Sequence, residues 1–426
     1  MLSQQDNELV TRVGPGTGLG ELMRRYWIPA ALQQELPEPD GAPIRVKVLG
    51  ERLVAFRDTA GRVGVVQEFC AHRRASLFLA RNEEHGLRCV YHGWKYDADG
   101  NCLEQPNEPP ETCYQSKIHL RAYPTTEAGG VIWAYLGPKD EMPAPPNFEW
   151  TRVPPSHRFL TKTIQECNWL QALEGGIDSS HSSFLHRALG GDPAQTAGIG
   201  WGGWRVKATA PKQDVVPTDF GFSYAAIRQL GEEGNFVKVY HYIMPFHTSF
   251  AFQLGASGET FKPEIHGHMF VPMDDENVMI YNLLFRFGGE PFSPEYIAEI
   301  EQLRGRGPGD QDAEFRKKRN YQNDWLIDRK HQKQHSFTGI LGINNQDHAV
   351  QESMGPVVDR TEEHLGTSDK AVVAVRLTLL TAIRSLASGK KPPAWALKQA
   401  KIRAIEKLLP KDVDWREALK SEIYPA

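Results

Sequence analysis

Residues 70–72 read CAH, and after a gap of sixteen residues the segment 89–92 reads CVYH. Two thiolates and two imidazoles are therefore available, from Cys70, Cys89, His72 and His92. In a Rieske [2Fe–2S] cluster two cysteines bind one iron and two histidines bind the other, which raises the reduction potential. The spacing therefore predicts a cluster that accepts and passes on single electrons.

A structural zinc site is the competing interpretation, because zinc also takes two cysteines and two histidines. Zinc fingers usually place both cysteines in one knuckle and both histidines in the other, whereas each knuckle here contains one of each. The segment 96–100 (YDADG) follows the second knuckle and is typical of a turn into another strand. These features favour the iron–sulfur cluster over zinc.

The residues around the two knuckles predict an all-β domain. Short strand-like runs separated by turn residues indicate an antiparallel barrel or sandwich with both knuckles at one tip, and they occupy 45–49, 52–56, 63–66 and 130–136. The segment 14–20 (GPGTGLG) lacks the G-x-G-x-x-G spacing of a dinucleotide loop, so we expect a flexible entry turn there. With this N-terminal extension, the cluster domain is predicted to span 1–145.

Five prolines between Pro143 and Pro155 indicate a linker to a second domain, predicted over 156–426. Strand-like runs and helical patterns both occur there, which favours an α+β domain with an antiparallel sheet flanked by helices. The expected strands are 236–240, 249–254, 267–271 and 278–285, and the expected helices are 165–187, 292–303, 345–356, 368–387 and a lysine-rich one over 393–426.

Composition limits the possible partners and compartments. The chain has 426 residues, a net charge of −4 and 40% hydrophobic residues, which is ordinary for a globular protein and argues against a nucleic-acid partner. A membrane span and a secretion signal are both absent from the pattern. Cys102, Cys113 and Cys167 are expected to be reduced, which fits the cytoplasm.

His181 and His186 suggest a second metal site. Two neutral imidazoles and one carboxylate form the facial triad of non-haem Fe(II) enzymes, which leaves coordination positions open. On an ideal helix, residues five apart point about 140° away from each other. The two rings can therefore meet one metal only if the helix bulges into π geometry or ends between them.

The third ligand must come from elsewhere in the chain, and we expect it to be Asp347. Glu352 competes locally, and Asp324 and Asp328 are more distant candidates. Asp178 lies three residues before the first histidine, so it is expected to contact that ring and fix its orientation.

The chain resembles the oxygenase component of Rieske non-haem iron ring-hydroxylating oxygenases, in particular the phthalate 4,5-dioxygenase group. The resemblance covers most of the chain and is clearest over 70–73, 91–94, 178–186, 267–268, 271–276, 323–329, 337–340, 355–360 and 364–369. It implies that Cys70, His72, Cys89 and His92 bind the [2Fe–2S] cluster. It implies that a mononuclear non-haem Fe(II) is bound by His181, His186 and Asp347, with Asn168 beside it.

The resemblance also implies how the enzyme is assembled. Asp178 would bridge the cluster of one subunit and the iron of its neighbour in a head-to-tail homotrimer, which some members stack into a hexamer. No nicotinamide or flavin fingerprint is present, so a separate NAD(P)H-dependent reductase with flavin and a plant-type [2Fe–2S] centre is expected. O2 and an aromatic carboxylate would be the substrates, with cis-dihydroxylation as the reaction.

Two alternatives remain open at this stage. One is a monooxygenase or O-demethylase of the same superfamily, and the other is an electron-transfer protein that uses only the cluster. The substrate carboxylate needs charge-assisted partners, for which the candidates are Arg205, Lys207, Lys238 and His241.

Overall fold

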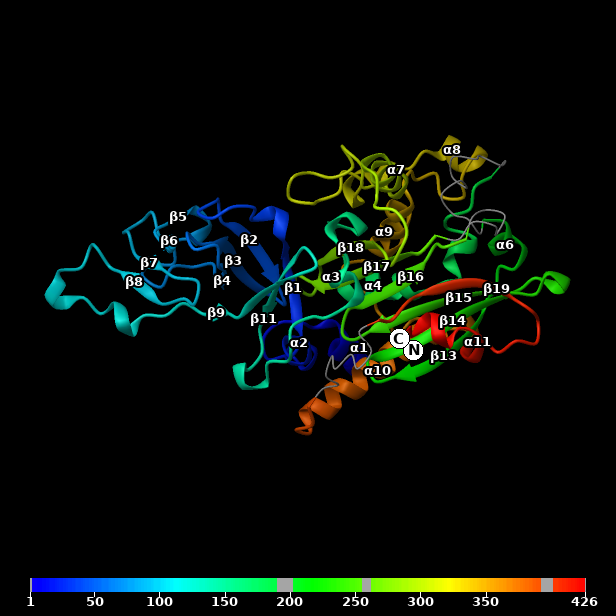
Figure 1. Cartoon of the computed structure of the whole chain (residues 1–426), viewed down its shortest axis with the longest axis horizontal. Helices are drawn as coiled ribbons and strands as arrows, with labels where there is room; N and C mark the ends of the chain where they lie inside the picture. Colours follow the sequence, from blue (N-terminus) through cyan, green and yellow to red (C-terminus); the bar gives the residue numbers. More distant parts are fainter. Residues whose placement is uncertain (1, 190–201, 255–261, 392–400, 426) are drawn as a thin grey trace. The chain divides into compact units, whose positions relative to one another are not determined.

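The computed structural model describes residues 2–189, 202–254, 262–391 and 401–425 (Figure 1). The chain divides into two compact units, Val13–Asn147 and a larger one formed by Met1–Arg12 with Phe148–Ala426. The boundary falls inside the proline-rich segment. The first twelve residues belong to the larger unit, whereas the prediction from sequence places them with the cluster domain.

The smaller unit is built from antiparallel sheets. A three-stranded sheet has the order β1-β11-β10, and two four-stranded sheets have the orders β2-β3-β4-β9 and β5-β6-β7-β8. The strands are β1 (Trp27–Leu32), β2 (Ile44–Val48), β3 (Glu51–Arg57), β4 (Val63–Gln67), β5 (Arg81–Glu83), β6 (Gly86–Arg88), β7 (Lys95–Tyr96), β8 (Cys102–Glu104), β9 (Ala122–Tyr123), β10 (Thr125–Ala128) and β11 (Val131–Tyr135). This unit is the all-β domain that the sequence predicts.

Two helices precede these strands, and the second overlaps the segment 14–20, for which a flexible entry turn is expected. Helix α1 (Gln4–Thr11) begins at Ser3, whose side chain accepts a hydrogen bond from the Asp6 amide. Helix α2 (Gly18–Arg24) begins at Thr17, whose hydroxyl accepts from the Gly20 amide at 3.1 Å. Hydroxyl side chains at these positions satisfy free N–H groups of the first turn, which stabilises both short helices, including the glycine-containing α2.

The larger unit contains an eight-stranded antiparallel sheet in the order β12-β18-β17-β16-β15-β14-β13, with β19 paired to β15. Its strands are β12 (Arg158–Gln165), β13 (Lys212–Thr218), β14 (Gly221–Gln229), β15 (Asn235–Ile243), β16 (His247–Ala251), β17 (Glu264–Pro272), β18 (Val278–Arg286) and β19 (Ile405–Leu409). The central strands are buried along nearly their whole length, because helices and loops cover them. The predicted α+β class is therefore confirmed.

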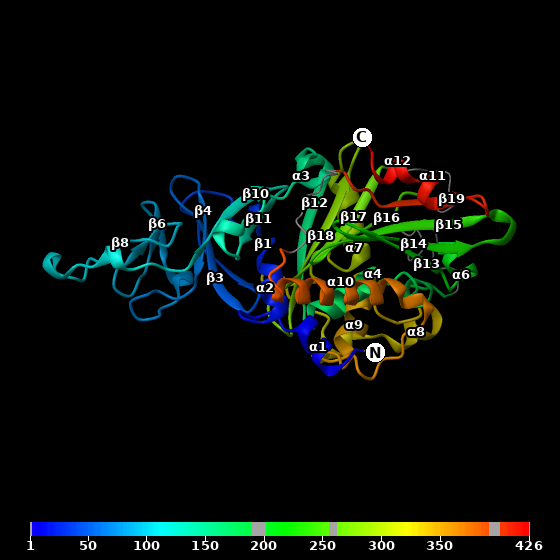
Figure 2. The same cartoon turned by 90° about the horizontal axis from the view of Figure 1, so that it is seen from below.

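Helices α4 and α10 contact each other and the sheet (Figure 2). The longer helices of this unit are α4 (Trp169–Ile177), α7 (Pro294–Arg304), α9 (Ile343–Ser353) and α10 (Lys370–Ala387), and shorter ones are α3 (Glu149–Arg152), α6 (Gly202–Lys207), α8 (Arg329–Gln334), α11 (Trp415–Ala418) and α12 (Lys420–Ile423). None of the helices in the described ranges combines the length and hydropathy that crossing a bilayer requires.

The C-terminal helix predicted over 393–426 is wrong for the part that the structure describes. Residues 405–409 form β19, and only two short helices follow; residues 392–400 lie outside the described residues. The side chains of Ile405 and Leu409 are buried in a cluster with Val237, Val239 and Trp415. Pairing with β15 satisfies the backbone of this segment and buries its apolar side chains, which outweighs its helical pattern.

Candidate active site

The cluster knuckles are two loops of the smaller unit. Cys70 follows β4, and its backbone N–H donates to the Ala75 carbonyl at 2.9 Å. Cys89 follows β6, and its backbone N–H donates to the Trp94 carbonyl at 2.8 Å. Gly93 has a φ of 80°, and a Cβ there would lie 2.6 Å from the ring of Pro106, so this turn requires glycine.

The donor set matches what a Rieske cluster needs. The rings of His72 and His92 lie 4.5 Å apart between centroids, and the Nδ1 atoms of both are buried without a hydrogen-bond partner in the described part of the chain. Hydrogen bonds from Cys89 and from the Tyr96 hydroxyl, 3.2 Å away, lower the pKa of the Cys70 thiol to about 6. A buried imidazole nitrogen with no partner is costly, and a thiolate is the metal-binding form of cysteine. These residues therefore fit the cluster.

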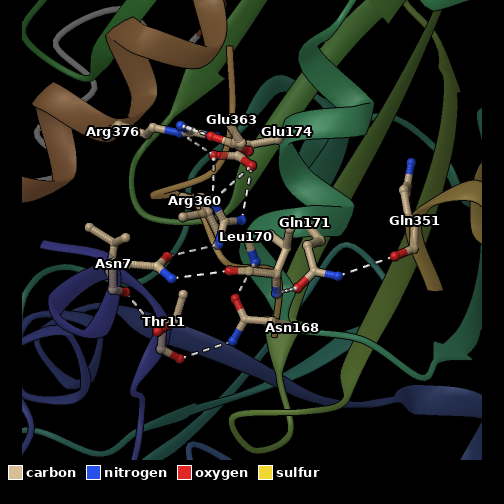
Figure 3. A network of polar contacts seen from close by, with 12 residues as sticks. Asn7, Thr11, Asn168, Leu170, Gln171, Glu174, Gln351, Arg360, Glu363 and Arg376 are labelled. Atoms are coloured by element: carbon tan, nitrogen blue, oxygen red, sulfur yellow. Dashed lines mark hydrogen bonds and ion pairs between the residues drawn. The ribbon is translucent and has the colours of Figure 1, made fainter. Parts of the chain in front are cut away.

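Helix α4 leads to the second site and is anchored at its first residue. The side-chain oxygen of Asn168 accepts from the Leu170 amide at 3.1 Å, and its amide group donates to the Thr11 carbonyl at 3.0 Å (Figure 3). The same amide group also donates to the Asp275 carbonyl at 2.6 Å. The hydrogen-bonding capacity of its amide N–H groups is thus fully used, and Asn168 does not line the cavity described below. The structure gives Asn168 a helix-capping role instead of the predicted place beside the iron.

Further along α4, the partly buried Glu174 accepts hydrogen bonds from two arginines. Arg360 Nη2 lies 2.9 Å from Glu174 Oε2, and Arg376 Nε lies 2.6 Å from Glu174 Oε1 (Figure 3). Gln171 Nε2 also donates to the carbonyl of Gln351 on α9 at 3.1 Å. These contacts connect α4 to α9 and α10, so the two segments that carry the triad share one scaffold.

His181, His186 and Asp347 come together at the end of α4. The two Nε2 atoms are 3.2 Å apart, and Asp347 Oδ1 lies 3.2 Å from His186 Nε2 and 3.5 Å from His181 Nε2. Helix α4 ends at Ile177, and only a short 3₁₀ turn over His181–Ser183 follows. The two histidines, five residues apart, can therefore face one point because α4 ends before them, and no π-bulge is needed.

Each histidine of the triad is oriented by a second side chain. Asp178 Oδ2 lies 3.3 Å from His181 Nδ1, and Gln346 Oε1 lies 2.8 Å from His186 Nδ1. With a proton on each Nδ1, both Nε2 atoms keep a lone pair. These lone pairs face the space shared with the Asp347 carboxylate, which is the arrangement that a bound metal requires. Burial opposes ionisation of Asp347, but the two histidines outweigh it and lower the pKa of Asp347.

The other carboxylates considered have different contacts. Glu352 accepts a hydrogen bond from Trp325 Nε1 at 2.6 Å and pairs with Lys317 at 3.3 Å. Asp328 caps α8, and Asp324 lies in a 3₁₀ segment away from the metal-ligand group. Of the four candidates, the structure brings only Asp347 to the histidines.

A cavity of about 130 Å³ includes the triad in its walls. Benzene is held by apolar cavities of about 150 Å³, so a single aromatic ring is an appropriate occupant. Aromatic side chains supply much of the wall, namely Tyr240, Phe250, Phe252 and Phe270. The charged groups that also line it are Asp178, Arg205, Lys238 and Arg304.

Two of the four predicted substrate residues line this cavity. Arg205 is 1% exposed and donates to the His186 carbonyl at 2.9 Å, and Lys238 is 1% exposed and lies 3.6 Å from Glu406. Lys207 is exposed and pairs with Glu233 at 2.8 Å. His241 is buried outside this cavity, where its Nδ1 lies 2.8 Å from Ser223 Oγ and its Nε2 lies 3.0 Å from the Arg403 carbonyl, so both ring nitrogens are hydrogen-bonded. Lys207 and His241 therefore do not line this cavity.

Sequence reasoning missed two residues of this site. Gln346 precedes Asp347 directly, so its position next to a ligand was a visible signal. Arg304 lies far from every recognised motif, and its place at the cavity depends on how α7 packs. No local pattern could have indicated it.

Comparison with known proteins agrees with this geometry. The family model "Rieske [2Fe-2S] domain" matches residues 26–124, and "LigXa C-terminal domain like" matches 134–425. The phthalate 4,5-dioxygenase oxygenase subunit of Pseudomonas putida is 38% identical, over 98% of this chain and 94% of that protein. The 3-chlorobenzoate-3,4-dioxygenase oxygenase subunit of Comamonas testosteroni is 36% identical, over 99% of each.

Other relatives carry different names. The 5,5'-dehydrodivanillate O-demethylase oxygenase subunit of Sphingobium sp. is 32% identical, over 92% of this chain and 83% of that protein. Among solved structures, dicamba monooxygenase bound to dicamba has a TM-score of 0.62 at 18% identity, covering 86% of this chain and 99% of that one. This likeness shows the shared fold.

The chain belongs to the Rieske non-haem iron oxygenases, as predicted. It is the oxygenase component of a multicomponent system that needs a separate reductase. Its family uses a [2Fe–2S] cluster together with a mononuclear non-haem iron.

Proposed function

We propose that this oxygenase cis-dihydroxylates an aromatic carboxylate of the phthalate type. The observation that carries the proposal is a ring-sized, aromatic-walled cavity that contains the triad and two buried cations, Arg205 and Lys238. A carboxylate on the ring would receive charge-assisted hydrogen bonds from the Arg205 guanidinium, and Lys238, whose own carboxylate partner is Glu406 at 3.6 Å, adds positive charge to the same wall. The phthalate and chlorobenzoate relatives support the same substrate class.

The metal groups would be held by the residues identified above. Cys70, His72, Cys89 and His92 would hold the cluster, and His181, His186 and Asp347 the Fe(II). When bound, the cluster supplies single electrons and the Fe(II) supplies the site of O2 activation. The balance is one ring, one O2, two electrons from the reductase and two protons, giving one cis-dihydrodiol.

Within this scheme Asp178 holds the ring of one iron ligand, His181, in place. Asp178 accepts hydrogen bonds from the backbone N–H and hydroxyl of Ser180, both at 2.7 Å, and from the backbone N–H of His181 at 3.1 Å. Those contacts fix the carboxylate against the imidazole of His181, so Asp178 keeps that ring in one tautomer. We assign Asp178 the further role of linking the two metal centres between subunits.

We also propose a head-to-tail homotrimer. Leu79, Val90 and Tyr91, which lie in or near the cluster loops, are 60%, 57% and 53% exposed. Exposed apolar groups concentrated at a functional tip are typical of an interface. A second copy would cover them and bring its own iron site near this cluster, and a mass of three chains in solution is the expected measurement.

An O-demethylase or monooxygenase is the second candidate, favoured by the O-demethylase relative. The experiment supplies reductase, NADH and either phthalate, 3-chlorobenzoate or a methoxylated benzoate under ¹⁸O2. Two ¹⁸O atoms in a ring diol support dihydroxylation, whereas one atom with release of formaldehyde supports demethylation. Failure of every aromatic acid to stimulate O2 uptake, while neutral aromatics do so, would overturn the proposed substrate class.

A further inference from the structure

Arg304 is a buried cation at the cavity that has no assigned role. It is the last residue of α7, is 9% exposed and lines the same cavity as the triad. Its one hydrogen bond runs from Nη2 to His266 Nδ1 at 2.9 Å. Within the described ranges no carboxylate forms an ion pair with it, so the remaining N–H groups of its guanidinium are uncommitted.

The contact with His266 fixes the guanidinium without neutralising it. His266 Nε2 lies 3.0 Å from Glu264 Oε1, so the ring donates there and presents its Nδ1 lone pair to Arg304. Burial keeps this imidazole neutral by lowering the pKa of His266 to about 4. Glu264 is itself paired with Arg286 at 3.2 Å, so its charge is already shared.

Two neighbouring cations of this unit have carboxylate partners. Arg306 Nε lies 2.9 Å from Glu301 Oε2, and Lys238 lies 3.6 Å from Glu406. Burial and the charge of Arg306 lower the pKa of Arg304 to about 10, so it remains protonated near neutral pH. A buried charge without a counterion is costly, and the C-terminal end of α7 offsets only part of that cost. Such a cost is explained if a ligand supplies the counterion.

The position of Arg304 is suited to a ligand with an aromatic ring. Its Cζ lies 5.7 Å from the centre of the Phe252 ring, and Lys238 Nζ lies 3.8 Å from the centre of the same ring. We propose that Arg304 is a specificity-determining residue whose guanidinium binds an anionic substituent other than the carboxylate assigned to Arg205 and Lys238. This inference rests on the proposed function and adds that the cavity selects rings bearing two acidic groups.

The test compares phthalate with benzoate on the holoenzyme. Arg304→Met removes the charge at similar length, Arg304→Lys keeps a cation, and Arg316→Met is a control at an exposed arginine paired with Glu166. A charged hydrogen bond contributes enough that its loss weakens binding about tenfold to a hundredfold. We expect that loss for phthalate with Arg304→Met, partial recovery with Arg304→Lys, and unchanged benzoate affinity in all three variants.

Thermal unfolding separates this role from a structural one. Without substrate, Arg304→Met should unfold at the wild-type temperature or above it, because a buried unpaired charge is removed. A lowered unfolding temperature with equal loss of both acids would overturn the inference, as would phthalate affinity equal to wild type. If the wild-type enzyme binds neither acid, the proposed function itself fails.

Discussion

Replacing Gln346 with leucine is expected to weaken binding of the mononuclear iron. Gln346 is buried, and its Oε1 accepts from His186 Nδ1 at 2.8 Å while its Nε2 donates to the Ile340 carbonyl at 2.9 Å. The second bond fixes which end of the amide faces the histidine. Leucine fills a similar volume but accepts no hydrogen bond, so the ring loses the contact that sets its tautomer.

Two independent estimates give the same magnitude. A buried donor left without an acceptor costs about 1–3 kcal/mol. Loss of a side chain that orients a metal ligand lowers affinity about 10- to 100-fold, which is about 1.4–2.7 kcal/mol at 1.36 kcal/mol per tenfold. Gln346→Glu keeps an acceptor toward Nδ1 but loses the bond to the Ile340 carbonyl, so its iron affinity should lie between those of Gln346→Leu and wild type.

The assay is anaerobic titration of iron-depleted protein with Fe(II) against a competing chelator, with the cluster's visible absorbance as an internal reference. Gln351→Leu is the matched control on the same helix. Its Oε1 accepts from Gln165 Nε2 at 2.8 Å, and it contacts none of the three ligands. The reasoning is refuted if Gln346→Leu binds Fe(II) like wild type, or if Gln351→Leu weakens binding equally.

Three further variants test other parts of the molecule. Asp178→Asn should leave both metal sites loaded but slow reoxidation of the reduced cluster in stopped-flow experiments; a normal rate would exclude its linking role. Tyr96→Phe should lower the cluster's reduction potential in spectroelectrochemistry, because it removes the 3.2 Å contact to the Cys70 sulfur. Burial opposes ionisation of Glu264, but His266 and its other partners outweigh burial and lower the pKa of Glu264 from 4.5 to about 2. The stability that its carboxylate contributes is therefore present above pH 4.5 and is lost as the pH falls toward 2. Glu264→Gln should therefore unfold at a lower temperature than wild type at pH 7. The difference between the two unfolding temperatures should narrow as the pH falls from 4.5 toward 2.

The elements that local sequence could predict are those in which local pattern and packing agree. The expected strand at 278–285 is β18, and the expected helix at 368–387 is α10. Both have apolar side chains at the spacing of their own structure, so burial reinforces the local preference. The two Cys-x-His knuckles were equally recognisable, since their chemistry lies within a few consecutive residues.

The spacing of the four candidate substrate residues shows that they cannot all face one cavity. Lys238 and His241 lie three apart on β15, and successive strand residues point to opposite faces, so only one of them can face the cavity. Arg205 and Lys207 lie two apart on α6, where such residues do not share a face. Sequence alone could not decide which member of each pair faces inward, because that depends on packing between distant segments.

Helix α9 makes the iron site a single mechanical unit. Consecutive residues on a helix differ by about 100°, so Asp347 and Gln346 project in different directions. Asp347 supplies an oxygen to the triad while Gln346 orients His186, and one helix therefore sets two of the three ligands. The same helix accepts a hydrogen bond from Gln171 of α4, the helix that leads to His181. A displacement of α9 would consequently disturb Asp347 and His186 directly, and it would disturb His181 through the contact of Gln171 with this helix.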